Sequence, residues 1–231
     1  MPPSSPLISR FDTVLRDATA GGHHFRLLAV RDTNTLLDAI DPHIFAADER
    51  FPYWADLWAS SVALAEYLTE MPAGKTVLEL GCGLGLAGIA AARAGASVTM
   101  TDIDTDALAF AAENVRLNLK PEEQSRVSIA AMDWRNPTAE GPFDLVIGAD
   151  IVYERRFFAP LLSLVTRLLA PGGSVLLADP DRAIGRDFLA MARSVGWRET
   201  TTRKRLVWNG TPVTVTIFSL TLTDADSSRE R

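Results

Sequence analysis

Cysteine is almost absent from this sequence: Cys82 stands alone among 231 residues, so no disulfide can form within the chain. That shortage is typical of a reducing compartment. The first residues also lack the basic and then apolar pattern of a secretory signal, so we expect a cytoplasmic protein. The three histidines, His23, His24 and His43, have no metal-ligand residues around them, so we expect no metal site. Long apolar runs are missing too, since none reaches the ~18 residues that a membrane-spanning helix needs.

A net positive charge is lacking as well. The formal charge is -6, which argues against a nucleic acid held through its phosphates. What is present is ordinary for a soluble globular protein, with 47% hydrophobic and 23% charged residues in a length that suits one domain. The regular apolar pattern covers 51–222, which we take as the domain of a monomer. We expect 1–50 to be an N-terminal extension and 223–231 a disordered tail.

Short apolar strands alternate with amphipathic helices along the domain. After a helical face at 54–68, strands are expected near 76–80, 97–101, 127–130, 143–148 and 174–178. Two late strands near 199–207 and 213–222 are joined through Asn209-Gly210, a dipeptide typical of tight hairpins, and an early strand is expected at 24–30. This order predicts an α/β fold: a doubly wound, mostly parallel seven-stranded sheet with helices on both faces and an antiparallel C-terminal hairpin.

A glycine-rich loop follows the strand at 76–80. Gly81, Gly83 and Gly85 lack Cβ atoms, so the backbone can turn tightly there and approach a ligand closely before the next helix exposes its free N–H groups. Glu79 precedes the loop, where its carboxylate is expected to bind a cation or to orient the loop. An acidic residue at this place suits a diphosphate poorly, because the two would repel each other.

Acidic residues also end the next two strands. Asp102 lies about 20 positions after the loop, a spacing at which a carboxylate can accept hydrogen bonds from both ribose hydroxyls. Ile103 beside it is expected to pack against a purine. Asp133 and Trp134 end the third strand and would supply a carboxylate for an exocyclic amine and a ring for the base.

Two other interpretations of the loop are open at this point. Gly83-Leu-Gly85-Leu-Ala-Gly88 spells the G-x-G-x-x-G pattern of dinucleotide-binding folds. Counted from Gly81, the first glycine after the strand, the third glycine position is taken by Leu86, which disfavours that fold. A glycine turn without any ligand would leave the acidic strand ends as coincidence.

With these residues in hand, the chain resembles the class I S-adenosylmethionine-dependent methyltransferases. The glycine motif Glu79–Gly85 and the strand-two motif Thr101–Asp104 are similar to theirs. The resemblance implies a Rossmann-like methyltransferase fold and S-adenosyl-L-methionine as cofactor. It further implies that Trp58, Gly81, Gly83, Asp102 and Trp134 line the cofactor site, to which we add Glu79, Gly85, Ile103, Asp133 and Ala149.

Three further segments resemble the small protein-lysine methyltransferases. They are an aromatic entry helix (Pro52–Trp58), a D-x-x-Y motif (Asp150–Tyr153) and a D-P-x-R segment (Asp179–Arg182), the last similar to the enzyme acting on the electron transfer flavoprotein β-subunit. Relatives often have Trp-Pro where this chain has Trp58-Ala59. The resemblance implies a protein substrate, with that β-subunit as the suspected partner. It also implies that Asp150 and Tyr153 face the acceptor as catalytic residues, and we assign Asp179 and Arg182 to substrate binding.

Each of these residues also has a structural alternative. Asp150 either orients the acceptor amine or caps a helix starting near Glu154. Tyr153 either lines a lysine channel or packs in the core, and Asp179 either contacts substrate or shapes a turn. For the whole protein, a small-molecule N-methyltransferase and a non-enzymatic S-adenosylmethionine-binding module remain the alternatives.

Overall fold

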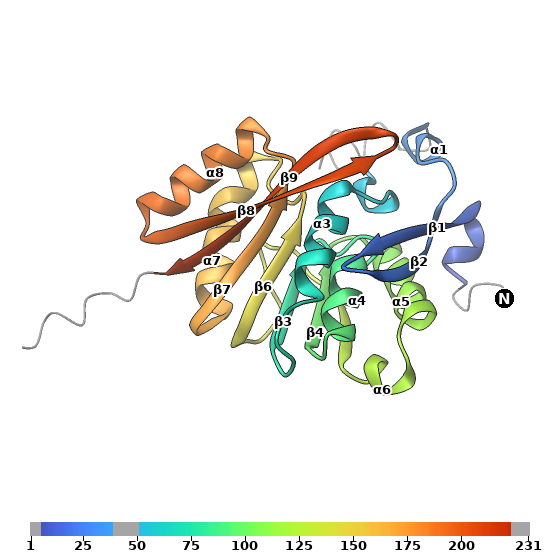
Figure 1. The fold of residues 1–231 in the computed structure, drawn as a ribbon, viewed down its shortest axis with the longest axis horizontal. Coiled ribbons are helices and arrows are strands. Elements are labelled where there is room, and N and C mark those ends of the chain that lie inside the picture. Colours follow the sequence, from blue (N-terminus) through green and yellow to red (C-terminus); the bar gives the residue numbers. More distant parts are fainter. Residues whose placement is uncertain (1–5, 39–50, 223–231) are drawn as a thin grey trace, which may run out of the picture.

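The structure is a computed structural model that describes residues 6–38 and 51–222. Its main sheet has seven strands in the order β5-β4-β3-β6-β7-β9-β8 (Figure 1), with β7–β9 and β9–β8 paired antiparallel and the other pairs parallel. The strands are β3 (Thr76–Leu80), β4 (Ser97–Asp102), β5 (Val127–Ala131), β6 (Phe143–Ala149), β7 (Leu169–Asp179), β8 (Trp197–Trp208) and β9 (Thr211–Leu222). The predicted fold class is confirmed.

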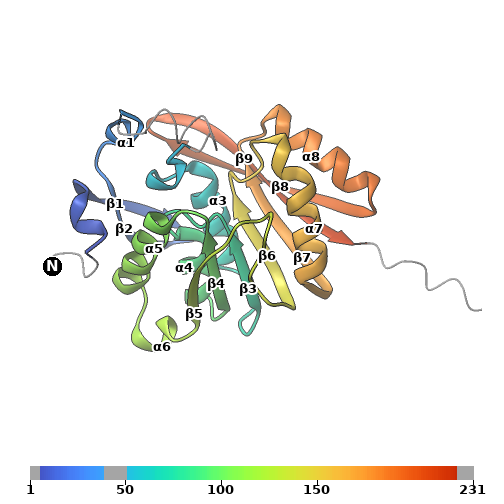
Figure 2. The ribbon, with the colours of Figure 1, turned by 180° about the vertical axis from the view of Figure 1, so that it is seen from behind.

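Helices cover both faces of this sheet (Figures 1 and 2). They are α1 (Asn34–Asp38), α3 (Ala59–Leu68), α4 (Leu86–Arg93), α5 (Thr105–Asn118), α6 (Pro121–Gln124), α7 (Phe158–Leu168) and α8 (Ala183–Ser194). The helices α3, α4 and α5 share one buried apolar cluster, and α7 and α8 share another on the opposite face. Along β3, Val77 faces the first cluster and Leu78 the second. Both faces of the strand are thus buried, which explains its continuous apolar run. No helix in the described ranges is long and apolar enough to cross a membrane.

The C-terminal hairpin forms where it was predicted. Asn209 and Gly210 have φ angles of 48° and 76°, the two positive values that a type I′ turn requires. Both strands are longer than expected, because β8 and β9 pair with each other beyond the point where β9 leaves β7 at Thr216.

The prediction of one helical face over 54–68 was wrong at its start. Trp54 lies in a short 3-10 helix, Tyr53–Ala55, and Trp58 has an extended backbone (φ -105°, ψ 144°), so α3 begins only at Ala59. The Asp56 side chain accepts a hydrogen bond from the Leu57 N–H, which stabilises a bend between the two helical segments. The two tryptophans therefore do not share a helical face.

The early part of the chain forms a second, two-stranded sheet of β1 (Thr13–Ala20) and β2 (His23–Val30), of which only β2 was predicted. Two asparagines of α5 hold this hairpin. The Asn114 side chain accepts a hydrogen bond from the Leu28 N–H (2.6 Å), and the Asn118 side chain accepts one from the Arg26 N–H (2.9 Å). Part of the expected extension is therefore packed on the domain. The expected tail at 223–231 and His43 lie outside the described residues.

Candidate active site

A cavity of about 1360 Å³ opens at the carboxyl ends of the parallel strands, where ligands bind on sheets of this kind. It brings together eleven of the fourteen predicted site residues: Trp58, Gly81, Gly83, Asp102, Ile103, Asp133, Trp134, Ala149, Asp150, Tyr153 and Arg182. Glu79, Gly85 and Asp179 do not line it.

The glycine loop forms the floor of the cavity. Gly81 and Gly83 have φ angles of 61° and 51°, and a Cβ at Gly83 would lie 3.3 Å from the Trp54 carbonyl oxygen. The Gly83 N–H donates to an oxygen of Asp102 at 3.0 Å. The loop is therefore held by the residue that ends the next strand.

Gly85, predicted to bind the cofactor, is not among the residues that line the cavity. A Cβ there would lie 2.5 Å from Cε of Met100 and 3.3 Å from Cβ of Ala111, both of which are buried. Gly85 (φ 85°) precedes α4 and faces the core, so it permits close packing of α5 and β4.

Glu79 likewise lies below the loop and away from the cavity. Its side chain is on the face of β3 covered by α4, and its Oε2 atom is buried without a hydrogen-bond partner. Burial raises the pKa of this carboxyl to about 8. A backbone hydrogen bond from Gly88 opposes the shift, and the nearby Asp102 adds to it. Glu79 is thus largely protonated at neutral pH, which argues against its predicted contact with a cationic ligand group.

Asp102 is placed as the sequence predicted. Besides the Gly83 N–H it accepts a hydrogen bond from the Asp104 N–H at 3.0 Å. Burial raises the pKa of its carboxyl, and these backbone hydrogen bonds oppose that shift. Each carboxylate oxygen keeps further lone pairs, so Asp102 can accept hydrogen bonds from two vicinal hydroxyls next to Ile103.

Asp133 and Trp134 also border the cavity, each with a neighbour that sequence reasoning missed. The Arg135 guanidinium donates hydrogen bonds to both carboxylate oxygens of Asp133 (2.7 to 3.0 Å). Fewer lone pairs of Asp133 are then free to accept from the exocyclic amine of the base. The Trp134 ring packs edge-on against Phe157 with centroids 5.4 Å apart, which holds the indole at the cavity wall.

The opposite end of the cavity holds Asp150 at the end of β6, with the unusual φ of 59°. Its N–H donates to the Ala178 carbonyl at 2.9 Å, and its carboxylate pairs with Arg182. The helix-cap alternative is wrong: a 3-10 helix does begin at Arg155, but its N-cap residue is Glu154, that of α7 is Phe157, and the Asp150 carboxylate is turned to the start of α8. Burial raises the pKa of Asp150, and the Ser60 hydroxyl and Arg182 oppose the shift.

Aromatic side chains border this end and form what we call the aromatic wall: Phe51, Tyr53, Trp58 and Tyr153. The Tyr53 ring lies 5.6 Å from that of Tyr153 and 6.1 Å from that of Trp58, whose Nε1 donates to the Tyr53 carbonyl at 2.8 Å. Burial raises the pKa of Tyr153 to about 12, so its hydroxyl stays neutral. Trp58 is 41% exposed and lies at the rim.

Sequence reasoning also left other residues of this cavity unassigned, among them Tyr53, Arg10 and Phe11. Tyr53 connects the aromatic wall, and its position in Pro52-Tyr-Trp54 was a usable signal that was assigned to a helix. Arg10 and Phe11 reach the cavity from the N-terminal segment, where nothing in the local pattern indicates a site. Trp54 lines the cavity as well, and its ring packs against that of Phe110 with centroids 5.3 Å apart.

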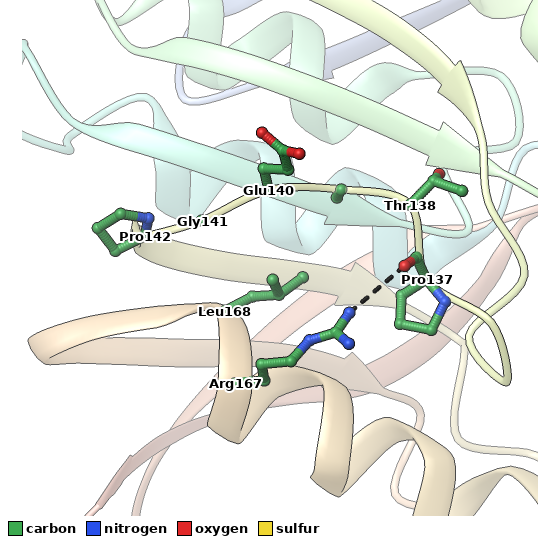
Figure 3. A pocket seen from close by; sticks show the side chains of 8 residues that line it. Pro137, Thr138, Glu140, Gly141, Pro142, Arg167 and Leu168 are labelled. Atoms are coloured by element: carbon green, nitrogen blue, oxygen red, sulfur yellow. Dashed lines mark hydrogen bonds between the residues drawn. The ribbon is translucent and has the colours of Figure 1, made fainter.

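Asp179, predicted to contact substrate, is 3% exposed and holds Arg182 instead. A second hollow of about 540 Å³ lies between residues 137–142 and the end of α7 (Figure 3). There the Arg167 guanidinium donates to the Pro137 carbonyl at 3.4 Å, and Glu140 points away from it (Figure 3). None of the predicted site residues lines this hollow. Within the described ranges, no three His, Cys, Asp or Glu side chains gather as a metal site.

The glycine floor, Asp102 and the apolar Ile103 and Trp134 together fit an adenosine group, with hydroxyl acceptors beside surfaces for a flat base. A model of the lysine methyltransferase family matches residues 49–194. The chain belongs to this family. Membership implies S-adenosylmethionine as the cofactor, and the residues present fit it.

Curated relatives share this middle part of the chain. The EEF1A lysine methyltransferase 3 of Mus musculus is 37% identical over 132 residues, which cover 56% of each chain. The protein N-lysine methyltransferase METTL21A of Mus musculus is 39% identical over 54% of this chain and 59% of its own. The electron transfer flavoprotein beta subunit lysine methyltransferase of Danio rerio is 35% identical over 57% of this chain and 51% of its own. The matches thus span between half and three fifths of these relatives.

Solved structures share the fold. The ribosomal protein L11 methylase of Lactobacillus delbrueckii subsp. bulgaricus has a TM-score of 0.52 at 24% identity, over 70% of this chain and 79% of its own. A TehB-like SAM-dependent methyltransferase of Corynebacterium glutamicum has a TM-score of 0.50 at 20% identity, over 80% of this chain and 96% of its own. At these identities the likeness speaks for the methyltransferase fold alone.

Proposed function

We propose that this protein is an S-adenosylmethionine-dependent protein-lysine N-methyltransferase. The observation that carries the proposal is one cavity with two different ends. One end holds the Gly81–Gly83 floor and Asp102, and the other holds Asp150 and the aromatic wall. Membership of the lysine methyltransferase family supports the same acceptor chemistry.

Bound S-adenosylmethionine supplies an electrophilic methyl group on a sulfonium. In the transfer, the lysine nitrogen forms a bond to the methyl carbon as the bond from that carbon to sulfur breaks, so alignment is the main task of the protein. The amine must first lose a proton, since its pKa is about 10.4 in water. Tyr153, the half-buried ring of the aromatic wall, favours the neutral amine by limiting its hydration, and Asp150 orients the nitrogen by accepting a hydrogen bond from it.

The electron transfer flavoprotein β-subunit is the protein substrate we favour. Support comes from the D-x-x-Y and D-P-x-R segments at 150–153 and 179–182, and from a relative named for that substrate. The METTL21A enzyme and a relative named for EEF1A match this chain at similar identity. EEF1A is therefore the comparison substrate.

A labelling experiment tests both levels of this proposal. The purified protein is incubated with methyl-labelled S-adenosylmethionine and with recombinant β-subunit, EEF1A or a protein-free metabolite extract. Label on the β-subunit that Asp150→Ala abolishes supports the proposal as stated. Label on EEF1A alone would keep the lysine methyltransferase but replace the β-subunit with EEF1A as its substrate. Label only in the metabolite extract would overturn lysine methylation in favour of a small-molecule acceptor.

A further inference from the structure

One guanidinium joins two carboxylates at the acceptor end of the cavity. Arg182 precedes α8, and its backbone N–H donates to Asp179 Oδ1 at 2.7 Å while its Nε donates to Asp179 Oδ2 at 3.0 Å. Its Nη2 pairs with Asp150 Oδ1. Asp150 follows β6 and Asp179 ends β7, which are neighbouring parallel strands, so the bridge spans their carboxyl ends.

The Asp179 end of this bridge is the fixed one. The side chain of Asp179 is 4% exposed, whereas those of Asp150 and Arg182 are 14% and 36% exposed. The start of α8 packs directly on it, since a Cβ at Gly185 would lie 3.3 Å from the Asp179 carboxyl carbon. Asp179 Oδ2 thus holds the Arg182 side chain through Nε at 3.0 Å and through Nη2 at 2.9 Å, and the same Nη2 also pairs with Asp150.

We propose that Arg182, clamped by Asp179, is a positioning residue that holds the Asp150 carboxylate toward the acceptor nitrogen. The proposal rests on the proposed function, in which Asp150 touches the acceptor. It replaces the direct substrate contact predicted for Asp179 with an indirect role in the same reaction.

The electrostatics of the site support this arrangement. Three groups act on the Asp150 carboxyl from three elements: the Ser60 hydroxyl of α3 and Arg182 before α8, which lower its pKa, and Asp179 of β7, which raises it. A buried carboxylate that loses its charged partner keeps its desolvation cost. Without Arg182 the Asp150 carboxyl would therefore bind a proton at higher pH and accept a hydrogen bond from the amine less well.

The test compares Arg182→Gln with Arg186→Gln. Arg186 lies in the first turn of α8, just after Arg182, and pairs with Asp181; both side chains are exposed, so its variant is the matched control. At pH 8.5 we expect Arg182→Gln to lower kcat/KM for the methylated protein by about 30-fold, because carboxylate placement is lost. The loss should grow by about threefold or more at pH 5.5, since removing an adjacent cation raises a carboxyl pKa by about one unit or more. S-adenosylhomocysteine affinity should stay within about twofold.

Two companion variants separate positioning from general damage. Arg182→Lys keeps the charge and should restore the pH profile while the rate recovers only in part. Asp179→Asn should lower the rate at pH 8.5 as Arg182→Gln does, but without the added loss at pH 5.5, because the Arg182 cation stays and a like charge is removed. At pH 8.5 the double variant should be no slower than Arg182→Gln alone, because both act through the same contact. Additive losses would overturn the clamp.

A direct readout needs no acceptor protein. Carbon-13 NMR titration of the Asp150 carboxyl should show its pKa raised by about one unit or more in Arg182→Gln and unchanged in Arg186→Gln. An unchanged Asp150 pKa, or a pH-independent loss of rate, would overturn the inference. If the wild-type protein labels no protein at all, the proposed function has failed, and the titration still decides whether Arg182 controls Asp150.

Discussion

The two ends of the cavity are built in different ways. At the cofactor end, Asp102 accepts hydrogen bonds from the backbone of Gly83 and Asp104, all within one strand-loop-strand unit. At the acceptor end, the Asp150 carboxylate pairs with Arg182 at the start of α8, 32 residues further along the chain. The contacts of the cofactor end join residues that are close in the sequence and follow from a local motif. The contacts of the acceptor end join residues that only the folded chain brings together.

Asp102 should show the largest effect, since the cofactor end depends on it. We propose that Asp102 accepts two charge-assisted hydrogen bonds from the ribose hydroxyls, so Asp102→Ala should weaken S-adenosylhomocysteine binding by about 3 kcal/mol, or ~100-fold, in isothermal titration. Asp102→Asn keeps a neutral acceptor and should fall between. Asp187→Asn, an exposed carboxylate of α8 paired with Arg155, is the control. Binding within threefold of wild type in a folded Asp102→Ala protein would contradict the assignment.

Gly85→Ala should separate packing from binding. Its Cβ meets Met100 and Ala111 at a φ of 85°, so we expect unfolding to become easier by about 3 kcal/mol in denaturant titration. Gly74→Ala has nearly the same φ, 82°, with nothing within 4 Å, and should lose only the strain of about 1 kcal/mol. Equal losses in the two variants would show that the close packing at Gly85 contributes nothing.

Tyr153→Phe tests the acceptor end with a smaller change. The ring contact with Tyr53 at 5.6 Å is kept and only the hydroxyl is lost, so kcat/KM should fall about tenfold with cofactor affinity unchanged. Because the pKa of Tyr153 is raised to about 12, its hydroxyl stays neutral between pH 6 and 10. The variant should therefore keep the shape of the wild-type pH profile. If the fall in rate at high pH were absent from the profile of Tyr153→Phe, Tyr153 would have a proton-transfer role instead.

Glu79→Gln should have the smallest effect on binding, less than about threefold, because Glu79 does not line the cavity. Its stability effect has a definite sign. The folded pKa of about 8 exceeds the ordinary 4.5, so the favourable contribution of the protonated form is complete below pH 4.5 and is lost as pH rises through 8. Thermal unfolding should show the variant gaining on wild type between pH 5 and 8. A constant difference would contradict the raised pKa.

Sequence patterns predicted the fold class, the C-terminal hairpin and the place of Asp102 at the end of a strand. Each of these depends on residues that are close together in the chain. The same patterns placed Glu79 and Gly85 in the cavity because both belong to the glycine motif, whereas alternation along β3 turns Glu79 toward α4 and the turn at Gly85 faces α5. The clamp between Asp179 and Arg182 depends on how tightly α8 packs on β7, which no local pattern records.

The most direct test of the central claim is peptide mass spectrometry of the electron transfer flavoprotein β-subunit after incubation with S-adenosylmethionine and either the wild-type protein or Asp150→Ala. We predict that wild type adds methyl groups to a lysine side chain and that Asp150→Ala does not, although it still binds S-adenosylhomocysteine. Methylation that proceeds equally with Asp150→Ala, or a product found only among small molecules, would contradict a lysine methyltransferase acting through this cavity.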